Sequence, residues 1–311
     1  MTALERTGAG GDNVRLAVAT ILGTVLALSL GDALIKLMSA GFGLWQIFVL
    51  RSMIALPLLV IAIRWIRPGA VPLVPRALGW TALRSVMLLA MWVAYYAALP
   101  HIPLSVAAAT YYTLPIFITL FAALLVGERV GAKAWAAVAV GFLGVLLILR
   151  PRAEDFSAYA LLPLVSAMLY ALAMILTRTR CRTEHPLTLS LALNAGFVAT
   201  GLVATAVLPA IGDEASFLSG AWTPMGGIEW AAMAVLAAAI LIGSIGAAVA
   251  YQAAPSSIVG TFDFAYVGFA TVWGLVFFAE VPDALTLAGM AMIVGAGILT
   301  VRRGPGEPLR T

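Results

Sequence analysis

The chain has 311 residues, of which 63% are apolar and only 10% charged, and its formal net charge is +4. A soluble domain carries roughly a quarter charged residues, so this chain cannot form a water-soluble surface, and lipid must cover most of its exterior. The single cysteine, Cys181, excludes an internal disulfide, and with only two histidines no metal-ligand spacing is present. We therefore expect neither a metal nor another cofactor.

Ten apolar segments follow one another along the chain, separated by polar, proline or glycine residues. Each can cross a hydrocarbon core of about 30 Å, where only a helix satisfies its own backbone. We interpret the first as a membrane span and not as a cleaved signal peptide, since it carries Asp32 and Lys36. The predicted spans are 15–38, 44–65, 79–99, 104–126, 133–149, 158–177, 187–208, 228–251, 257–279 and 285–301.

The distribution of basic residues predicts the orientation. With the N-terminus in the cytoplasm, the outer side holds only Lys36, Arg150 and Arg152. The cytoplasmic segments hold Arg6, Arg15, Arg64, Arg67, Arg76, Arg129, Lys133, Arg178, Arg180, Arg182, Arg302, Arg303 and Arg310. This asymmetry predicts a multi-pass protein of a bacterial-type inner membrane with both termini cytoplasmic. Because the basic residues lie in short loops and form no stripe with aromatic residues, nucleic-acid binding is not expected.

Ionisable side chains inside predicted spans mark candidate functional positions, because they are costly in lipid. Asp32 and Lys36 share a helical face. Asp32 and Arg51 lie almost equally far from the turn near Gly41, so a hairpin would place them at one depth. We hypothesise an ion pair between Asp32 and Arg51. Its role is either to stabilise the helix packing or to take part in recognition of substrate charge or in gating of transport. Lys36 and Arg84 can also be explained by snorkelling of their charged ends to the membrane surface.

Asp263 lies about six residues into its predicted span, among aromatic residues. A buried, unpaired carboxylate tends to take up a proton, so Asp263 is a candidate for proton coupling or for pairing with a substrate ammonium group. The alternative is a structural acid that hydrogen-bonds the backbone near a helix start.

Aromatic residues cluster on the predicted hairpin of the third and fourth spans. Trp92, Tyr95 and Tyr96 fall at helical spacing, and Tyr111 and Tyr112 follow on the next span. A tyrosine hydroxyl is expensive in lipid unless it finds a partner or water, so this cluster predicts a cavity wall that stacks an aromatic or apolar group. An interfacial aromatic belt is the alternative, and it suits Tyr95 and Tyr96 better. Weaker candidates for the same wall are Tyr170 and Tyr251.

The chain contains an internal repeat. Aligning Glu128 with Glu280 superposes spans 4 and 5 on spans 9 and 10, each pair being an apolar helix closed by Glu and a small-residue-rich helix ending in Arg. Five spans per half is an odd number, so the second copy must insert upside down. The predicted fold is all-α, with two inverted five-helix repeats at 1–149 and 158–301, an outer connection at 150–157 and a cytoplasmic tail at 302–311.

The pattern T-x-x-x-x-P-x-x-x-x-L-x-A-x-x-x-x-x-E-R, which contains Pro115, Glu128 and Arg129, resembles the EamA-type branch of the drug/metabolite transporter superfamily. The second copy departs from it, with Val267 at the position of Pro115 and Ala279 at that of Gly127. The resemblance covers about residues 15–301 and implies a ten-helix carrier with a central cavity. Pro115 is the best hinge candidate, and we assign Glu128 and Glu280 structural or gating roles.

The resemblance implies an exporter of amino acids, including aromatic ones, that works by alternating access and functions as a monomer. The alternatives are an importer of a bulky metabolite such as S-adenosylmethionine or riboflavin, and a membrane channel or scaffold without alternating access. An enzyme is not expected, because the sequence contains no phosphate loop and no Ser/His/Asp set.

Overall fold

The computed structural model describes residues 12–38, 41–66, 71–98, 101–102, 107, 110–150, 158–208, 217–218, 220, 222–279 and 281–301, and this part of the chain contains helices and no strands. The helices are α1 (Val14–Met38), α2 (Leu44–Ile66), α3 (Leu78–Ala98), α5 (Leu114–Phe121), α6 (Ala132–Leu149), α7 (Leu161–Thr179), α8 (Pro186–Val207), α9 (Gly227–Ala253), α10 (Ser256–Asp263), α11 (Ala265–Phe278) and α12 (Ala284–Val301). Short turns of other helix types are η2 (Ala122–Val126) and η4 (Ala158–Ala160).

Eight of these helical segments are long and apolar enough to cross a membrane, and two shorter apolar helices, Leu114–Val126 and Ala284–Leu299, accompany them. The predicted ranges coincide closely with the helices, for example 15–38 with α1 and 44–65 with α2. This agreement follows from physics, because a stretch that matches the bilayer thickness and lacks ions has no alternative to a helix.

The fourth and ninth predicted ranges are both interrupted. In the first, a turn at Thr113 precedes α5, and Pro115 occupies the first turn of that helix, where its missing N–H removes no hydrogen bond of the helix. In the second, Phe264 separates α10 from α11, and Val267 N–H donates to the Phe264 carbonyl. Pro115 therefore starts a helix instead of kinking one, which corrects its expected position within a span.

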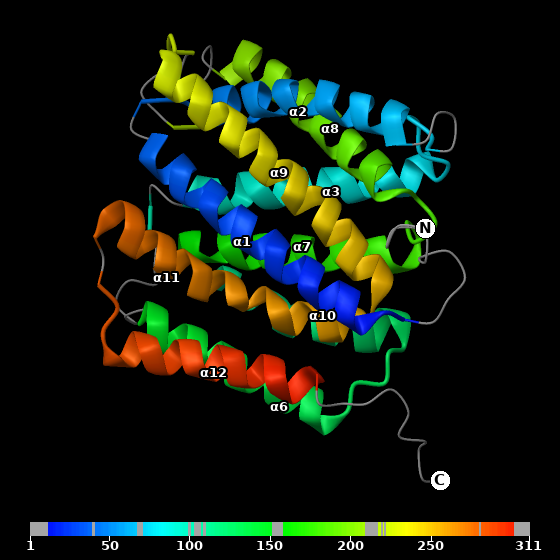
Figure 1. The fold of residues 1–311 in the computed structure, drawn as a ribbon, viewed down its shortest axis with the longest axis vertical. Helices are drawn as coiled ribbons and strands as arrows, with labels where there is room; N and C mark the ends of the chain where they lie inside the picture. Colours follow the sequence, from blue (N-terminus) through cyan, green and yellow to red (C-terminus); the bar gives the residue numbers. More distant parts are fainter. Residues whose placement is uncertain are drawn as a thin grey trace.

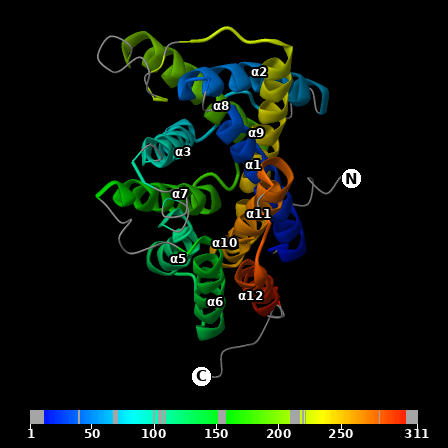
Figure 2. The same cartoon turned by 90° about the vertical axis from the view of Figure 1, so that its left-hand side faces the viewer.

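The helices run roughly antiparallel and pack in defined pairs (Figure 1). α6 packs on α12, α2 on α8, α1 on α9 and α11, and α7 on α3 and α5. Viewed along the bundle, α6 with α12 and α2 with α8 form its two edges, and α1, α3, α7, α10 and α11 lie between them (Figure 2). The middle of the bundle is therefore walled by these central helices.

The two ends of the bundle differ in charge. We call the end where α1 begins and α12 ends the basic end, at the right of Figure 1. It carries the described basic residues Arg15, Arg64, Arg76, Arg129, Lys133, Arg178, Arg180 and Arg182. The opposite end carries Lys36 and Arg150. The asymmetry that the sequence predicted is thus present along the folded bundle.

The α6–α12 edge is held by close backbone approach. A Cβ atom on Gly144 would lie 2.7 Å from the Gly289 carbonyl oxygen, and one on Gly289 would lie 2.5 Å from that of Gly144. Small residues permit such contact between membrane helices. At the end of the bundle opposite the basic end, Arg150 forms an ion pair with Asp283. The hydrogen bond from Arg150 holds the pKa of this exposed carboxyl well below its usual range, so the pair persists at mildly acidic pH.

Candidate functional site: a central cavity

A cavity of about 660 Å³ lies in the middle of the bundle. Its mouth is at the end opposite the basic end, where it is lined by Lys36 and by Val281, which is 81% exposed. Its floor is formed by buried residues such as Met174 and Ala247. Met174 lies five residues before the end of α7, and Ala247 six before the end of α9. About 8–9 Å of packed helix therefore closes the cavity towards the basic end.

Aromatic residues form one unbroken series around the cavity wall. The ring centroids of Tyr96 and Tyr95 lie 5.7 Å apart, those of Tyr95 and Tyr111 5.1 Å, and those of Tyr111 and Tyr112 5.4 Å. Tyr112 then contacts Tyr266 at 5.2 Å. These are favourable distances for aromatic pairs. The sequence analysis thus placed four of these five rings together correctly, and the fifth comes from α11.

The series begins and ends at one carboxylate. Tyr96 donates a hydrogen bond to Asp32 Oδ1 at 3.0 Å, and Tyr266 donates one to Asp32 Oδ2. Trp92 stacks on Tyr96 with ring centroids 5.5 Å apart. All of these residues line the cavity. The result is a carboxylate held by two hydroxyls within an aromatic wall, an arrangement that attracts a cationic group through both charge and ring quadrupoles.

The direct Asp32–Arg51 ion pair is not formed among the described residues, which corrects that hypothesis. The buried guanidinium of Arg51 instead lies over the rings of Phe48 and Phe197, at 4.4 and 4.9 Å from their centroids. Asp32 and Arg51 still interact electrostatically. Arg51 does not line the cavity. It packs against aromatic rings on the side of the wall that faces away from the cavity.

Asp263 lies at the end of α10, where that helix meets α11. Its carboxylate accepts a hydrogen bond from Tyr251 and lines the cavity, whereas the fully buried Tyr251 does not. Tyr170 also lines the cavity and lies near Asp263. Of the three candidates, Asp263 and Tyr170 can therefore reach a ligand, and Tyr251 holds Asp263 in place.

The sequence analysis missed two wall residues. Tyr266 follows Asp263 by three positions, and the wall continues along the same helical face at Val267, Ala270 and Gly274; this spacing was visible in the sequence. Arg84 was expected to extend to the membrane surface, but it is only 1% exposed and lines the cavity. At the mouth, the Lys36 ammonium lies 4.2 Å from the centroid of Phe278.

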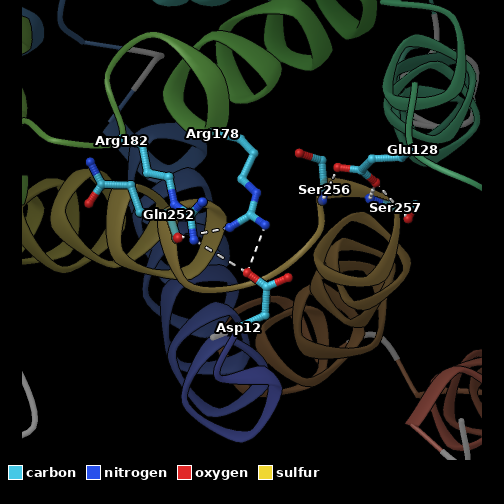
Figure 3. Close-up of polar contacts among 7 residues, drawn as sticks. All are labelled: Asp12, Glu128, Arg178, Arg182, Gln252, Ser256 and Ser257. Atoms are coloured by element: carbon cyan, nitrogen blue, oxygen red, sulfur yellow. Dashed lines mark hydrogen bonds and ion pairs between the residues drawn. The ribbon is translucent and has the colours of Figure 1, made fainter. Parts of the chain in front are cut away.

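Polar contacts join the helices at the basic end, below the cavity floor (Figure 3). Arg178 at the end of α7 pairs with Asp12 at 2.7 Å and donates to the Gln252 carbonyl of α9 at 3.0 Å. The Gln252 amide donates to the carbonyls of Cys181 and Glu184, at 2.7 and 2.9 Å. These contacts connect α1, α7 and α9 in one network.

Glu128 provides a second link at the basic end (Figure 3). Its carboxylate accepts hydrogen bonds from the backbone N–H groups of Ser256 and Ser257, at 3.0 and 3.3 Å, and from the Ser257 hydroxyl at 3.0 Å. A carboxylate at a helix N-terminus is stabilised by the free N–H groups and the helix dipole. Glu128 thus ties the chain after η2 to the start of α10. Its predicted counterpart, Glu280, lies outside the described residues.

Comparisons with known proteins agree with this architecture. A model described as the EamA-like transporter family matches residues 15–150. The pseudopaline exporter of Pseudomonas aeruginosa is 31% identical over 89% of this chain and 93% of its own. A riboflavin transporter of Rhizobium johnstonii is 32% identical over 72% and 70% of the two chains. An S-adenosylmethionine uptake transporter of Rickettsia felis is 22% identical over 64% and 63%.

The fold also matches a solved structure. A protein known from its crystal structure superposes with a TM-score of 0.74 over 91% of this chain and 96% of its own, at 19% sequence identity. This likeness concerns the fold alone.

Proposed function

This chain belongs to the EamA-like transporter family, and we propose on that premise that it exports small metabolites, with amino acids, including aromatic ones, as the first substrate class. The family and the transporter relatives point to a carrier and not to an enzyme. The observation that carries the substrate proposal is the tyrosine series that closes on Asp32. In this proposal the rings stack the side chain, and the cavity carboxylates meet the ammonium group.

The size of the cavity supports a substrate of this kind or larger. Its volume of about 660 Å³ falls in the range of pockets that hold drug-sized ligands, about 300–1,000 Å³. In the proposed inner-membrane orientation the basic end faces the cytoplasm. The cavity then opens outward, and the Asp12–Arg178 and Glu128–Ser257 contacts close the cytoplasmic side.

Alternating access follows if the halves form inverted repeats. The observed packing pairs are converted into one another when each helix of one half is exchanged with its counterpart in the other half. The counterparts are α1 and α7, α2 and α8, α3 and α9, α5 and α10 with α11, and α6 and α12. The α1–α9 pair becomes α7–α3, and α1–α11 becomes α7–α5. This pattern supports the two repeats at 1–149 and 158–301, and exchanging the conformations of such repeats opens a central site to each side in turn.

The repeat also predicts the effect of a backbone substitution. Gly127 and Ala279, which the alignment pairs, both adopt positive φ angles, 74° and 54°. A left-handed conformation costs a non-glycine residue about 1–2 kcal/mol. We therefore expect Ala279→Gly to raise the thermal stability of the detergent-solubilised protein. Gly127→Ala should lower it for conformational reasons alone, because no atom lies within 4 Å of the added Cβ. Shifts of equal sign would contradict this assignment.

Counterflow into proteoliposomes tests the proposed function. Vesicles loaded with an unlabelled amino acid should accumulate the labelled amino acid from outside, and vesicles with no protein should not. Phenylalanine, tryptophan and a small amino acid form the first panel. If folded, reconstituted protein exchanges no amino acid, the proposed substrate class is wrong.

The second candidate is an importer of a bulky metabolite. It is favoured by the relatives described as riboflavin transporters and as S-adenosylmethionine uptake transporters. The same counterflow assay with labelled riboflavin and S-adenosylmethionine separates this candidate from the first. A membrane protein without alternating access would give no counterflow with any solute.

Asp263 is proposed as the proton-coupling group or the partner of a substrate ammonium. If it couples protons, Asp263→Asn should flatten the pH dependence of uptake while exchange at a single pH continues. An unchanged pH profile in this variant, measured between pH 5 and pH 8, would remove the coupling role.

A further inference from the structure

Arg84 stands out among the cavity residues because its charge has no carboxylate partner within the described chain. It lies six residues into α3, and its side chain is 1% exposed. Its Nε donates to the Thr177 hydroxyl at 2.6 Å, whereas its Nη1 is buried without a hydrogen-bond partner. Proteins rarely leave a buried guanidinium group unsatisfied, because removing an unpaired charge from water is costly.

The two carboxylates of the cavity accept hydrogen bonds from tyrosine hydroxyls and form no ion pair with Arg84 among the described residues. Tyr96 and Tyr266 donate to Asp32, and Tyr251 donates to Asp263. The titratable groups near Arg84 are Cys181 and Tyr170, and neither side chain is an anion at neutral pH. The cavity therefore presents two carboxylates that are held by hydroxyls and one guanidinium group with an unfilled donor.

We propose that Arg84 binds the carboxylate of the transported molecule at the closed end of the cavity, an inference that rests on the proposed carrier function. A guanidinium group offers a planar fork of donors that matches a carboxylate. Arg84 is the one cation among the described residues of the cavity floor. It neutralises a singly charged carboxylate, whereas a doubly charged phosphate would keep excess charge in surroundings formed by Leu88, Met174 and Ala247.

The depth of Arg84 fits an α-amino acid. Arg84 lies six residues from the basic-end start of α3, and Asp263 seven from the start of α10, so both lie about 9–10 Å from that end. Tyr170 lies near both side chains. Asp32, by contrast, lies six residues from the other end of α1. The amino-acid head group thus fits between Arg84 and Asp263, and its side chain reaches towards the tyrosine series.

Pairs of ligands that differ only in the carboxylate test this inference. The probes are tryptophan against tryptamine and phenylalanine against phenethylamine, added as competitors in counterflow. The wild type should bind each acid more tightly than its amine. Arg84→Gln should weaken the acid by about tenfold or more and leave the amine within about twofold. Arg84→Lys, which keeps a charge without the fork, should fall between.

Thr177→Val is the matched control, because it removes the one hydrogen bond that Arg84 donates among the described residues and keeps the charge of Arg84. It should weaken the acid less than Arg84→Gln does. Equal loss of acid and amine in the glutamine variant would show a merely structural role and overturn the inference. A wild type that transports only amines or uncharged solutes such as riboflavin would also overturn it while leaving the carrier function intact. A wild type that exchanges no solute would overturn both.

Discussion

The Asp32→Asn variant should lose transport by about a hundredfold or more, while remaining folded. The asparagine keeps the shape of the side chain, but it removes the negative charge at the point where the tyrosine series closes. Its amide nitrogen would also face hydroxyl groups that now act as donors, and unsatisfied buried polar groups cost about 1–3 kcal/mol each. Initial rates of counterflow at saturating and limiting substrate measure the effect.

Tyrosine variants test the contribution of each hydrogen bond to Asp32. Tyr96→Phe and Tyr266→Phe each remove one donor to Asp32 and keep the ring, so each should reduce transport by about tenfold. Tyr112→Phe is the matched control, because its ring contacts Tyr111 and Tyr266 but its hydroxyl bonds to no described residue. It should stay close to the wild type. Normal transport by Asp32→Asn, or equal loss in all three phenylalanine variants, would exclude the proposed role of Asp32 in transport.

The membrane spans could be predicted because hydropathy and length determine them almost alone. The interruption near Pro115 carried a visible signal, although we placed the proline inside a span and not at a helix start. The matching interruption at Phe264 carried none, since Val267 stands where the proline would be. That break depends on how α10 meets α5 and α12 in the folded protein, and no local pattern encodes it.

The candidate site could be predicted only as far as contacts within one half of the chain allowed. The hairpin of the third and fourth spans brought Tyr95 and Tyr111 together, as expected. Asp32 was recognised as a candidate residue, but its partner Tyr266 was not, because Tyr266 comes from a segment 234 residues away. Arg84 was misplaced because α3 is apolar on most sides, and its rotation towards the cavity is set by packing on α7.

The second large effect is expected at Glu128. Glu128→Gln should lower transport and shift the protein towards a state open at the basic end. The carboxylate accepts bonds from the start of α10, whereas the amide carries half its acceptors and no charge to meet the helix dipole. Losing charge-assisted bonds worth about 1.5–3 kcal/mol changes the ratio of the two states by about one to two powers of ten.

Cys181 reports this opening in the native chain. It is the single cysteine, and it lies fully buried in the basic-end network, where burial raises the pKa of its thiol. Thiolate is therefore scarce at neutral pH, and modification of Cys181 by a maleimide should be slow.

Opening of the basic end hydrates the thiol and lowers its pKa. Modification should therefore be about tenfold faster in Glu128→Gln. Glu229→Gln, an acid in the first turn of α9 at the opposite end, should leave the rate unchanged. Because the Glu128 contacts and the Cys181 network close the same end of the cavity, faster labelling and slower transport must appear together. Either result alone would show that Glu128 does not control the closure of this end.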